Sequence, residues 1–233
     1  MEIKNQLTII IPCKNESNLI TYTLGLLDKQ HKIQGTRVIV SDSSDDDTRF
    51  LISNSKFKNL NIEIIDGGFP AQARNNGAIL SETEYVLFLD ADIFLTDTKT
   101  IHDSLTYIIE NELSLVTTKL RTKGRYSYVF PIFELFRDFF VHHNVFVIGG
   151  YMLFDRDVFF EVGGFNPKHL FAEDYTLSGK INYKDFGVVN KKIYTTDRRF
   201  RKKGLWYMVK MMILSFLNKN NSKFFEKHHN YWS

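Results

Sequence analysis

The strongest constraint on the fold is the alternation of apolar runs and helical segments in the first half of the chain. Four runs have the apolar, β-branched character of strands that are covered on both faces: Leu7–Ile11, Arg37–Ser41, Ile62–Ile65 and Tyr85–Leu89. Three helical segments lie between them: Ser17–Lys29, which Asn15 or Ser17 could cap, Thr48–Asn54 and Ala71–Leu80. This order predicts an α/β fold, with helices flanking a mostly parallel central sheet and right-handed crossovers.

A polar cluster follows each of the four predicted strands. The clusters are Pro12–Glu16, Asp42–Thr48, Asp66–Gly68 and Asp90–Asp92. Ligands of open parallel sheets bind beyond the carboxyl ends of the strands. Any one cluster alone would be an ordinary surface loop, but together the four predict one ligand-binding crevice.

The second half of the chain is less regular. The aromatic-rich segment Tyr126–Ile148 carries charged residues, which favour a helix packed on the sheet over a membrane span. The segment Leu205–Leu217 predicts an amphipathic helix that packs on the core or lies on a membrane. The sequence contains no internal repeat and no low-complexity linker, which favours a single main domain.

Charge is unevenly distributed along the chain. The net charge is +3, yet the residues from Arg198 onward contain nine Lys or Arg and one acid, Glu226, so this part carries about +8 and the rest about −5. Such asymmetry indicates an anionic partner, either a phosphate-bearing ligand or an anionic membrane surface. We expect no nucleic-acid partner, because no nucleic-acid-binding motif occurs.

Cysteine content and hydropathy bear on localisation. The single cysteine, Cys13, excludes an intrachain disulfide, which fits a reducing compartment. We read no secretory signal before Pro12 and no apolar run of about 18 residues. We therefore expect a cytoplasmic protein, with peripheral contact at the inner face of the membrane through its basic C-terminal segment.

The pair Asp90-Ala91-Asp92 follows a buried strand, so both carboxylates would leave that strand on the same side. Oxygen ligands of this kind suit Mg²⁺ or Mn²⁺, and a diphosphate would supply further oxygens. An isolated pair of this type is more often a solvated loop, and its position after a buried strand favours the metal site.

Further candidate residues each have an ordinary structural alternative. Asp42 could accept hydrogen bonds from a base or ribose, or belong to a helix cap. Arg74, near a helix start, could contact phosphate. Glu173-Asp174 could supply a general base or simply favour a helix N-terminus. The basic run from Arg198 to Lys203 could bind a diphosphate or form a solvated surface.

As an ordered set, these motifs resemble the family-2 glycosyltransferases, which have the GT-A fold. The resemblance extends from about Leu7 to about Gly204. Four segments carry it: Ile9–Ser17 with its Pro-x-x-Asn-Glu turn, Val38–Thr48 with its acidic loop, Pro70–Ile93 with its Ala-Arg-Asn-x-Gly helix and metal motif, and Gly149–Ile181 with its Glu-Asp pair.

The resemblance assigns roles to individual positions. Asp92 and Asp90 would hold the metal and ribose, with Asp92 the better metal ligand, and Asp174, beside Glu173, would be the catalytic base. The remaining donor-binding positions would be Pro12, Asn15, Glu16, Asp42, Arg74, Arg198 and Arg199. The chain would divide into a catalytic domain over residues 1–204, with a nucleotide-binding half (1–97) and an acceptor-side half (98–204), and a basic amphipathic extension over residues 205–233.

Two departures from the family pattern affect these expectations. Ser41 stands where the family often has a first Asp, and Thr196–Phe200 lies in place of the processive Gln-x-x-Arg-Trp motif. The second departure favours transfer of a single sugar over polymerisation.

The resemblance implies an inverting transferase that moves a sugar from a nucleotide-diphosphate donor to an acceptor hydroxyl or a lipid phosphate. A UDP-sugar is favoured, with guanine and thymine still open as bases. Two alternatives stay open: a non-catalytic nucleotide-sugar-binding or membrane-associated protein, and a sugar-phosphate nucleotidyltransferase. The nucleotidyltransferase is disfavoured because Pro12–Glu16 is not a Gly-rich phosphate loop.

Overall fold

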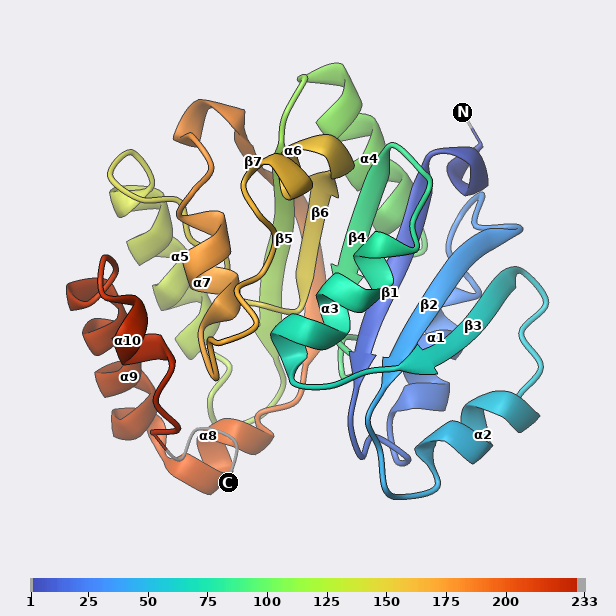
Figure 1. Cartoon of the computed structure of the whole chain (residues 1–233), viewed down its shortest axis with the longest axis horizontal. Coiled ribbons are helices and arrows are strands. Elements are labelled where there is room, and N and C mark those ends of the chain that lie inside the picture. Colours follow the sequence, from blue (N-terminus) through green and yellow to red (C-terminus); the bar gives the residue numbers. More distant parts are fainter. Residues whose placement is uncertain (1, 230–233) are drawn as a thin grey trace.

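A computed structural model describes residues 2–229 and contains one seven-stranded sheet (Figure 1). The strand order across the sheet is β3-β2-β1-β4-β6-β5-β7. The strands are β1 (Leu7–Cys13), β2 (Thr36–Asp42), β3 (Leu60–Asp66), β4 (Tyr85–Leu89), β5 (Leu115–Thr122), β6 (Tyr151–Asp155) and β7 (Phe186–Thr195). The predicted α/β architecture with a mostly parallel sheet is confirmed.

Pairing directions show how the sheet is assembled. The four N-terminal strands are mutually parallel where they pair, and β5 pairs with β7 in parallel. β6 runs antiparallel to both β4 and β5. The start of β6 therefore lies beside the end of β4, where Leu89 faces Tyr151. This arrangement brings Gly149 and Gly150, just before β6, to the carboxyl edge of the parallel strands.

Helices cover both faces of the sheet. One face packs against α1 (Ile20–Leu27), α4 (Thr100–Glu110) and α5 (Val129–Phe140). The other packs against α3 (Pro70–Ile79), α6 (Arg156–Glu161) and α7 (Glu173–Ser178), which lie in front of the sheet in Figure 1. The remaining helices are α2 (Thr48–Asn54), α8 (Arg198–Lys203), α9 (Leu205–Leu217) and α10 (Ser222–Phe225), with short 3₁₀ turns at Ile3–Asn5 and Tyr183–Asp185.

The cap predicted for the first helix was wrong, whereas the helix expected within Tyr126–Ile148 is present over a shorter range. The first helix begins at Ile20, and neither Asn15 nor Ser17 caps it, because its cap position is Leu19 and has no side-chain hydrogen bond. Asn15 instead adopts a left-handed conformation (φ 55°) that turns the chain after β1. The expected helix within Tyr126–Ile148 spans only Val129–Phe140, and the chain then continues as an irregular segment toward β6.

Helix α9 packs on the core. Met211 is buried beside Phe171 and Phe225, while Leu205 and Met208 pack against the large core cluster. Within residues 2–229, no helix has both the length and the apolar character needed to cross a membrane. Strands from both predicted halves of the catalytic domain join in the one sheet. The predicted domain boundaries at residues 97 and 204 stay a prediction. Residues 230–233 of the predicted extension lie outside the described residues.

Candidate active site

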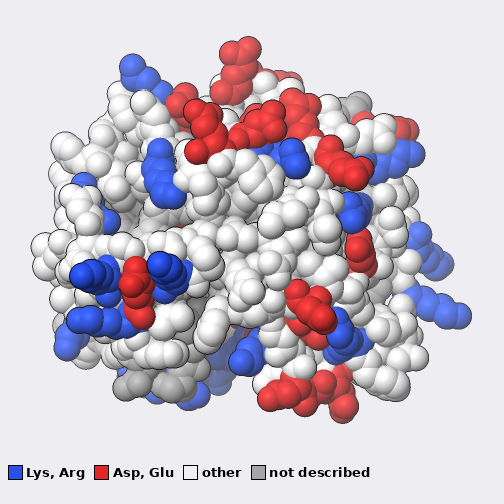
Figure 2. Space-filling view, viewed as in Figure 1, with Lys and Arg blue, Asp and Glu red and all other residues white. Residues whose placement is uncertain are grey.

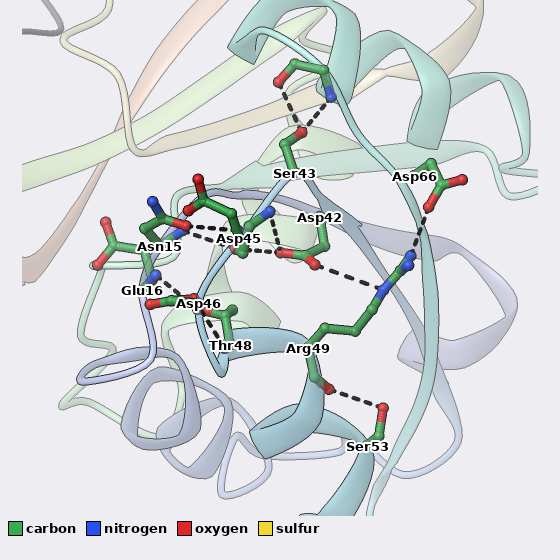
Figure 3. A network of polar contacts seen from close by, with 12 residues as sticks. Asn15, Glu16, Asp42, Ser43, Asp45, Asp46, Thr48, Arg49, Ser53 and Asp66 are labelled. Atoms are coloured by element: carbon green, nitrogen blue, oxygen red, sulfur yellow. Dashed lines mark hydrogen bonds and ion pairs between the residues drawn. The ribbon is translucent and has the colours of Figure 1, made fainter.

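The loops after β1 and β2 hold each other in place (Figure 3). The backbone N–H of Asn15 donates to Oγ of Ser44 at 2.8 Å, and its side-chain Oδ1 accepts from the N–H of Asp45 at 3.0 Å. The N–H of Glu16 donates to Oγ1 of Thr48 at 3.0 Å. These bonds explain the left-handed turn at Asn15, because that turn aims both backbone and side chain at the second loop.

Asp42 lies at the centre of this loop pair, where it is 6% exposed. Its Oδ1 accepts from the hydroxyl of Ser44 at 2.6 Å, and its Oδ2 lies 3.7 Å from Nε of Arg49. Arg49 in turn donates to Asp66 at 2.8 Å. Figure 3 shows this chain of contacts linking the ends of β2 and β3. The carboxylate is thus fixed by hydrogen bonds at the strand ends, and its expected contact with a base or ribose stays a prediction.

Arg74 reaches the site because α3 lies close to the sheet. A Cβ at Gly77 would lie 2.5 Å from Cγ2 of Ile10 on β1, so only glycine permits this approach. Asn75, on the same helix, donates to the carbonyl of Phe165 at 2.7 Å. The helix is therefore held against both the sheet and the loop that leads to α7.

Arg74 joins two carboxylates from distant parts of the sequence. Its Nη2 donates to Oδ1 of Asp90 at 2.6 Å, and its Nη1 donates to Oε1 of Glu173 at 2.6 Å. The guanidinium lies 5.2 Å from the ring centre of Phe165. Burial disfavours the charge, but Asp90 and Glu173 more than offset that effect and raise the pKa of Arg74. Arg74 is 5% exposed and bridges the two carboxylates, and its expected contact with the donor stays a prediction.

Asp174 occupies the first turn of α7. The preceding Ala172 adopts the left-handed conformation (φ 53°), a strained arrangement for a residue with a side chain. The carboxylate of Asp174 accepts from the backbone N–H of Gly149 at 2.6 Å and of Tyr175 at 2.8 Å. Burial, assisted by the neighbouring Glu173 charge, raises the pKa of Asp174 to about 6. A carboxylate with a pKa in this range is suited to accept a proton near neutral pH.

Asp92 lies after β4 and contacts residues at the end of β7. Its Oδ2 accepts from the hydroxyls of Thr195 and Thr196 at 3.3 and 3.2 Å. Arg198, at the start of α8, donates through Nη2 to the same oxygen at 3.2 Å and to Oε1 of Glu16 at 2.6 Å. Its Nη1 donates to Oε2 of Glu16 at 3.0 Å. Arg198 therefore links the loop after β1 to the loop after β4.

The Glu16 carboxylate is affected by this crowding of charge. Burial raises the pKa of Glu16, and the Arg198 hydrogen bonds oppose the rise. The hydrogen bonds to Glu16 raise the pKa of Arg198, which keeps the guanidinium charged. A cation at this position offsets the repulsion among Glu16, Asp90 and Asp92.

The carboxylates of Asp90 and Asp92 fit a hard divalent cation by their oxygen chemistry. Both follow one buried strand, and both have partly exposed side chains (33% and 23%). In the described part of the chain, no group of three or more His, Cys, Asp or Glu residues could hold a metal by itself. A cation here would therefore need further oxygens from a bound diphosphate or from water.

The structure brings most of the predicted site residues to one edge of the sheet. Pro12 pairs with Ser41 in the β1–β2 ladder, and its donor-binding role stays a prediction. Arg199 lies near Tyr207: burial raises the pKa of Tyr207, and the Arg199 charge opposes that rise. The donor-binding role of Arg199 stays a prediction. Sequence reasoning missed four contributors, namely the Gly149 amide, the hydroxyls of Thr195 and Thr196, and the Arg49 link.

A cavity of about 520 Å³ lies beside α7 and α10. Its walls include Tyr175, Thr176, Lys180 and Ser222, and none of the predicted donor-site residues lines it. The Asp42, Asp90 and Asp174 carboxylates are thus separate from this cavity, and the candidate site rests on their own contacts.

Two curated bacterial proteins are similar to part of the chain. The poly(ribitol-phosphate) β-N-acetylglucosaminyltransferase TarS of Staphylococcus aureus is 29% identical over 120 residues, which cover 49% of this chain and 21% of TarS. The poly-β-1,6-N-acetyl-D-glucosamine synthase of Staphylococcus epidermidis is 29% identical over 130 residues, which cover 52% of this chain and 30% of the synthase. The chain thus spans less than a third of the length of these relatives.

Solved structures share the fold. Residues 1–349 of S. aureus TarS in complex with UDP-GlcNAc match with a TM-score of 0.65 and 22% identity over 82% of this chain and 58% of that chain. The Pyrobaculum calidifontis mannosyltransferase PcManGT, in complex with GDP-Man and Mn²⁺, matches with a TM-score of 0.61 and 19% identity over 81% of this chain and 56% of that chain. Residues 8–163 match the family described as glycosyl transferase family 2. Because this match covers more than half of the sequence, the chain belongs to glycosyl transferase family 2.

Proposed function

We propose that this protein is an inverting glycosyltransferase that moves a single sugar from a nucleotide-diphosphate donor to an acceptor. The observation that carries the proposal is the chain of contacts from Asp174 to the end of β4. Asp174 stands next to Glu173, and Arg74 ties Glu173 to Asp90 through two 2.6 Å bonds. A proton acceptor is thereby held in a fixed relation to the carboxylates that would meet the donor diphosphate.

The proposed reaction is a direct displacement. Asp174 accepts the proton of the acceptor hydroxyl as its oxygen attacks the anomeric carbon, and the bond from that carbon to the diphosphate breaks on the opposite face. The amide of Gly149 and the amide of Tyr175 hold the Asp174 carboxylate in position. A divalent cation, Mn²⁺ or Mg²⁺, held by Asp92 with Asp90 would neutralise charge on the departing diphosphate. Arg198 would add a second positive charge from α8.

A UDP-linked donor is the favoured substrate. TarS, whose structure contains UDP-GlcNAc, and PcManGT, whose structure contains GDP-Man and Mn²⁺, share the fold. In this chain Asp42 would contact the base, with Asn15 and Glu16 beside it. The lack of the processive motif at Thr196–Phe200 supports transfer of one sugar at a time.

The acceptor in this proposal is a hydroxyl group or a lipid-linked phosphate. The basic residues from Arg198 onward support an anionic acceptor or an anionic membrane beside the site. A cytoplasmic enzyme with peripheral contact at the inner face of the membrane would have access to both the nucleotide sugar and a lipid-linked acceptor.

The proposal is tested by separating donor binding from transfer. A thermal-shift panel of UDP- and GDP-sugars, with Mn²⁺, Mg²⁺ or a chelator, should show metal-dependent stabilisation by one donor class. Asp174→Asn should keep that stabilisation and lose transfer by about 10²–10⁴-fold, the range for a general base. Donor binding without any transfer or donor hydrolysis by the unmodified protein would favour the non-catalytic alternative. Pyrophosphate release from a nucleoside triphosphate would favour the nucleotidyltransferase.

A further inference from the structure

Two helices expose large apolar side chains on their outer surfaces. On α5, Leu135 is 73% and Phe139 75% exposed. On α9, Trp206 is 84% and Leu217 71% exposed, and Ile213 lies between them on the same stripe. Scattered apolar side chains are normal on a surface, but a set at helical spacing on neighbouring helices indicates an interaction site.

The two exposed stripes lie next to each other. Phe216 of α9 contacts Phe136 and Phe140 of α5, with ring centres 6.3 and 5.7 Å apart. Leu135 and Phe139 directly precede those two α5 rings in sequence, and Leu217 directly follows Phe216. The aromatic contact therefore joins the stripes into one surface, here called the α5–α9 face: Leu135, Phe139, Trp206, Ile213 and Leu217.

Positive charge accompanies this face. Lys210 lies between Trp206 and Ile213 on the exposed stripe of α9, and Lys202 precedes α9 on α8. On the α5 side, Arg137 is buried and pairs with the exposed Asp138, so the positive charge of the face comes from α8 and α9. Figure 2 shows further Lys and Arg side chains around a single acidic one over α10, at the left of the view. Basic and apolar groups together favour an anionic interface between water and hydrocarbon.

We propose that the α5–α9 face docks on the surface of an anionic lipid bilayer. Leu135, Phe139 and Trp206 would enter the acyl boundary, while Lys202 and Lys210 would contact lipid phosphates. A second copy of the chain fits less well, because it would bring two sets of like charges together. The inference deepens the proposed function, on which it rests for the choice of a lipid-linked acceptor.

The position of the face suits that acceptor. Arg198, which contacts Asp92 and Glu16, begins α8, and α8 leads through Gly204 directly into α9. The docked helix and the donor site are thus separated by one short helix. A lipid phosphate at the bilayer surface would meet the site from the side of α8.

Flotation with vesicles tests the proposal on the full chain without any donor. We expect binding to vesicles that contain phosphatidylglycerol and weak binding to phosphatidylcholine vesicles.

The α5 pair Leu135→Ser/Phe139→Ser and the α9 pair Trp206→Ser/Leu217→Ser should each lower the partition coefficient roughly 10-fold or more. Lys202→Gln/Lys210→Gln should lower binding to the anionic vesicles only. Phe50→Ser/Ile79→Ser, which removes two side chains of similar exposure (65% and 66%) elsewhere, is the matched control and should change nothing.

A second measurement requires no disruptive variant. The sequence contains two tryptophans, so Trp232→Phe leaves Trp206 as the single reporter. Its emission should shift to the blue and be quenched by brominated lipid when anionic vesicles are added.

Three results would overturn the proposal. They are unchanged flotation of the α5 pair, equal binding to neutral and anionic vesicles, and a dimer in solution that the face variants dissociate. Failure of the proposed function is distinguishable, because a protein that floats as expected but binds no nucleotide sugar would refute the enzyme assignment and leave the docking face intact.

Discussion

The backbone N–H of Gly149 donates a 2.6 Å hydrogen bond to Oδ2 of Asp174. A Cβ at position 149 would lie 2.5 Å from that same oxygen, so any side chain there would displace the carboxylate. We predict that Gly149→Ala lowers the transfer rate by on the order of 10²-fold, the cost of misplacing a reacting group by about 1 Å. Donor binding, measured by thermal shift, should change little.

Gly25→Ala provides the matched control for this variant. Apart from its chain neighbours and the backbone of its own helix α1, a Cβ at Gly25 would meet no atom within 4 Å. Its transfer rate should equal that of the unmodified protein. Equal activity of Gly149→Ala would show that the Gly149 amide does not position the base.

The raised pKa of Asp174, about 6, predicts an acid limb in the pH dependence of transfer. Asp174 works as a base only when deprotonated, so activity should rise as pH increases through about 6 and fall tenfold per unit below it. The value of kcat/KM for the acceptor, measured from about pH 4.5 to pH 8, reports this titration in the free enzyme. Donor binding at each pH is the control. A plateau that extends down to about pH 4.5 would mean that another group, or no group, acts as the base.

The buried ion pair between Arg74 and Glu173 predicts that removal of Arg74 destabilises the protein strongly. Arg74→Met leaves the buried Glu173 carboxylate without its partner, which should cost roughly 3–5 kcal/mol in the free energy of unfolding measured with urea. The double variant Arg74→Met/Glu173→Gln removes the unpaired charge and should recover part of the loss. If the double variant were as unstable as the single one, the buried ion pair would not be the cause.

The first four strands could be predicted from the sequence because a buried parallel strand is a continuous apolar run, as β1 and β4 are. The rest of the sheet carries a weaker pattern. β5 contains buried threonines and a partly exposed Lys119, β7 contains a partly exposed Lys191, and the two strands pair across a long stretch of sequence. The antiparallel insertion of β6 between β4 and β5 depends on tertiary packing, which periodicity does not report.

The carboxylates of the site could also be predicted, since Asp42, Asp90 and Asp92 follow strands whose ends share one edge. The contacts that organise them could not. Arg198 reaches Glu16 across 182 positions because the segment that follows β4 reaches the end of β7, where Phe94 and Tyr194 form a bridge. The role of Arg74 was likewise hidden, because its two carboxylate partners and its burial appear only in the folded chain.

The position of Arg198 predicts a competition between this side chain and the metal. Its Nη2 lies 3.2 Å from Oδ2 of Asp92, the proposed metal ligand. Arg198→Ala should therefore bind Mn²⁺ alone more tightly, yet bind the UDP-sugar with Mn²⁺ about 10-fold more weakly, because a charge-assisted hydrogen bond to the diphosphate is lost. Isothermal titration of each ligand measures both effects.

Arg201→Ala is the control, since Arg201 lies on the same helix and pairs with Asp197. Both arginines are well exposed, so neither variant should lose more than about 1 kcal/mol in stability. Identical metal and donor affinities in the two variants would remove Arg198 from the donor site.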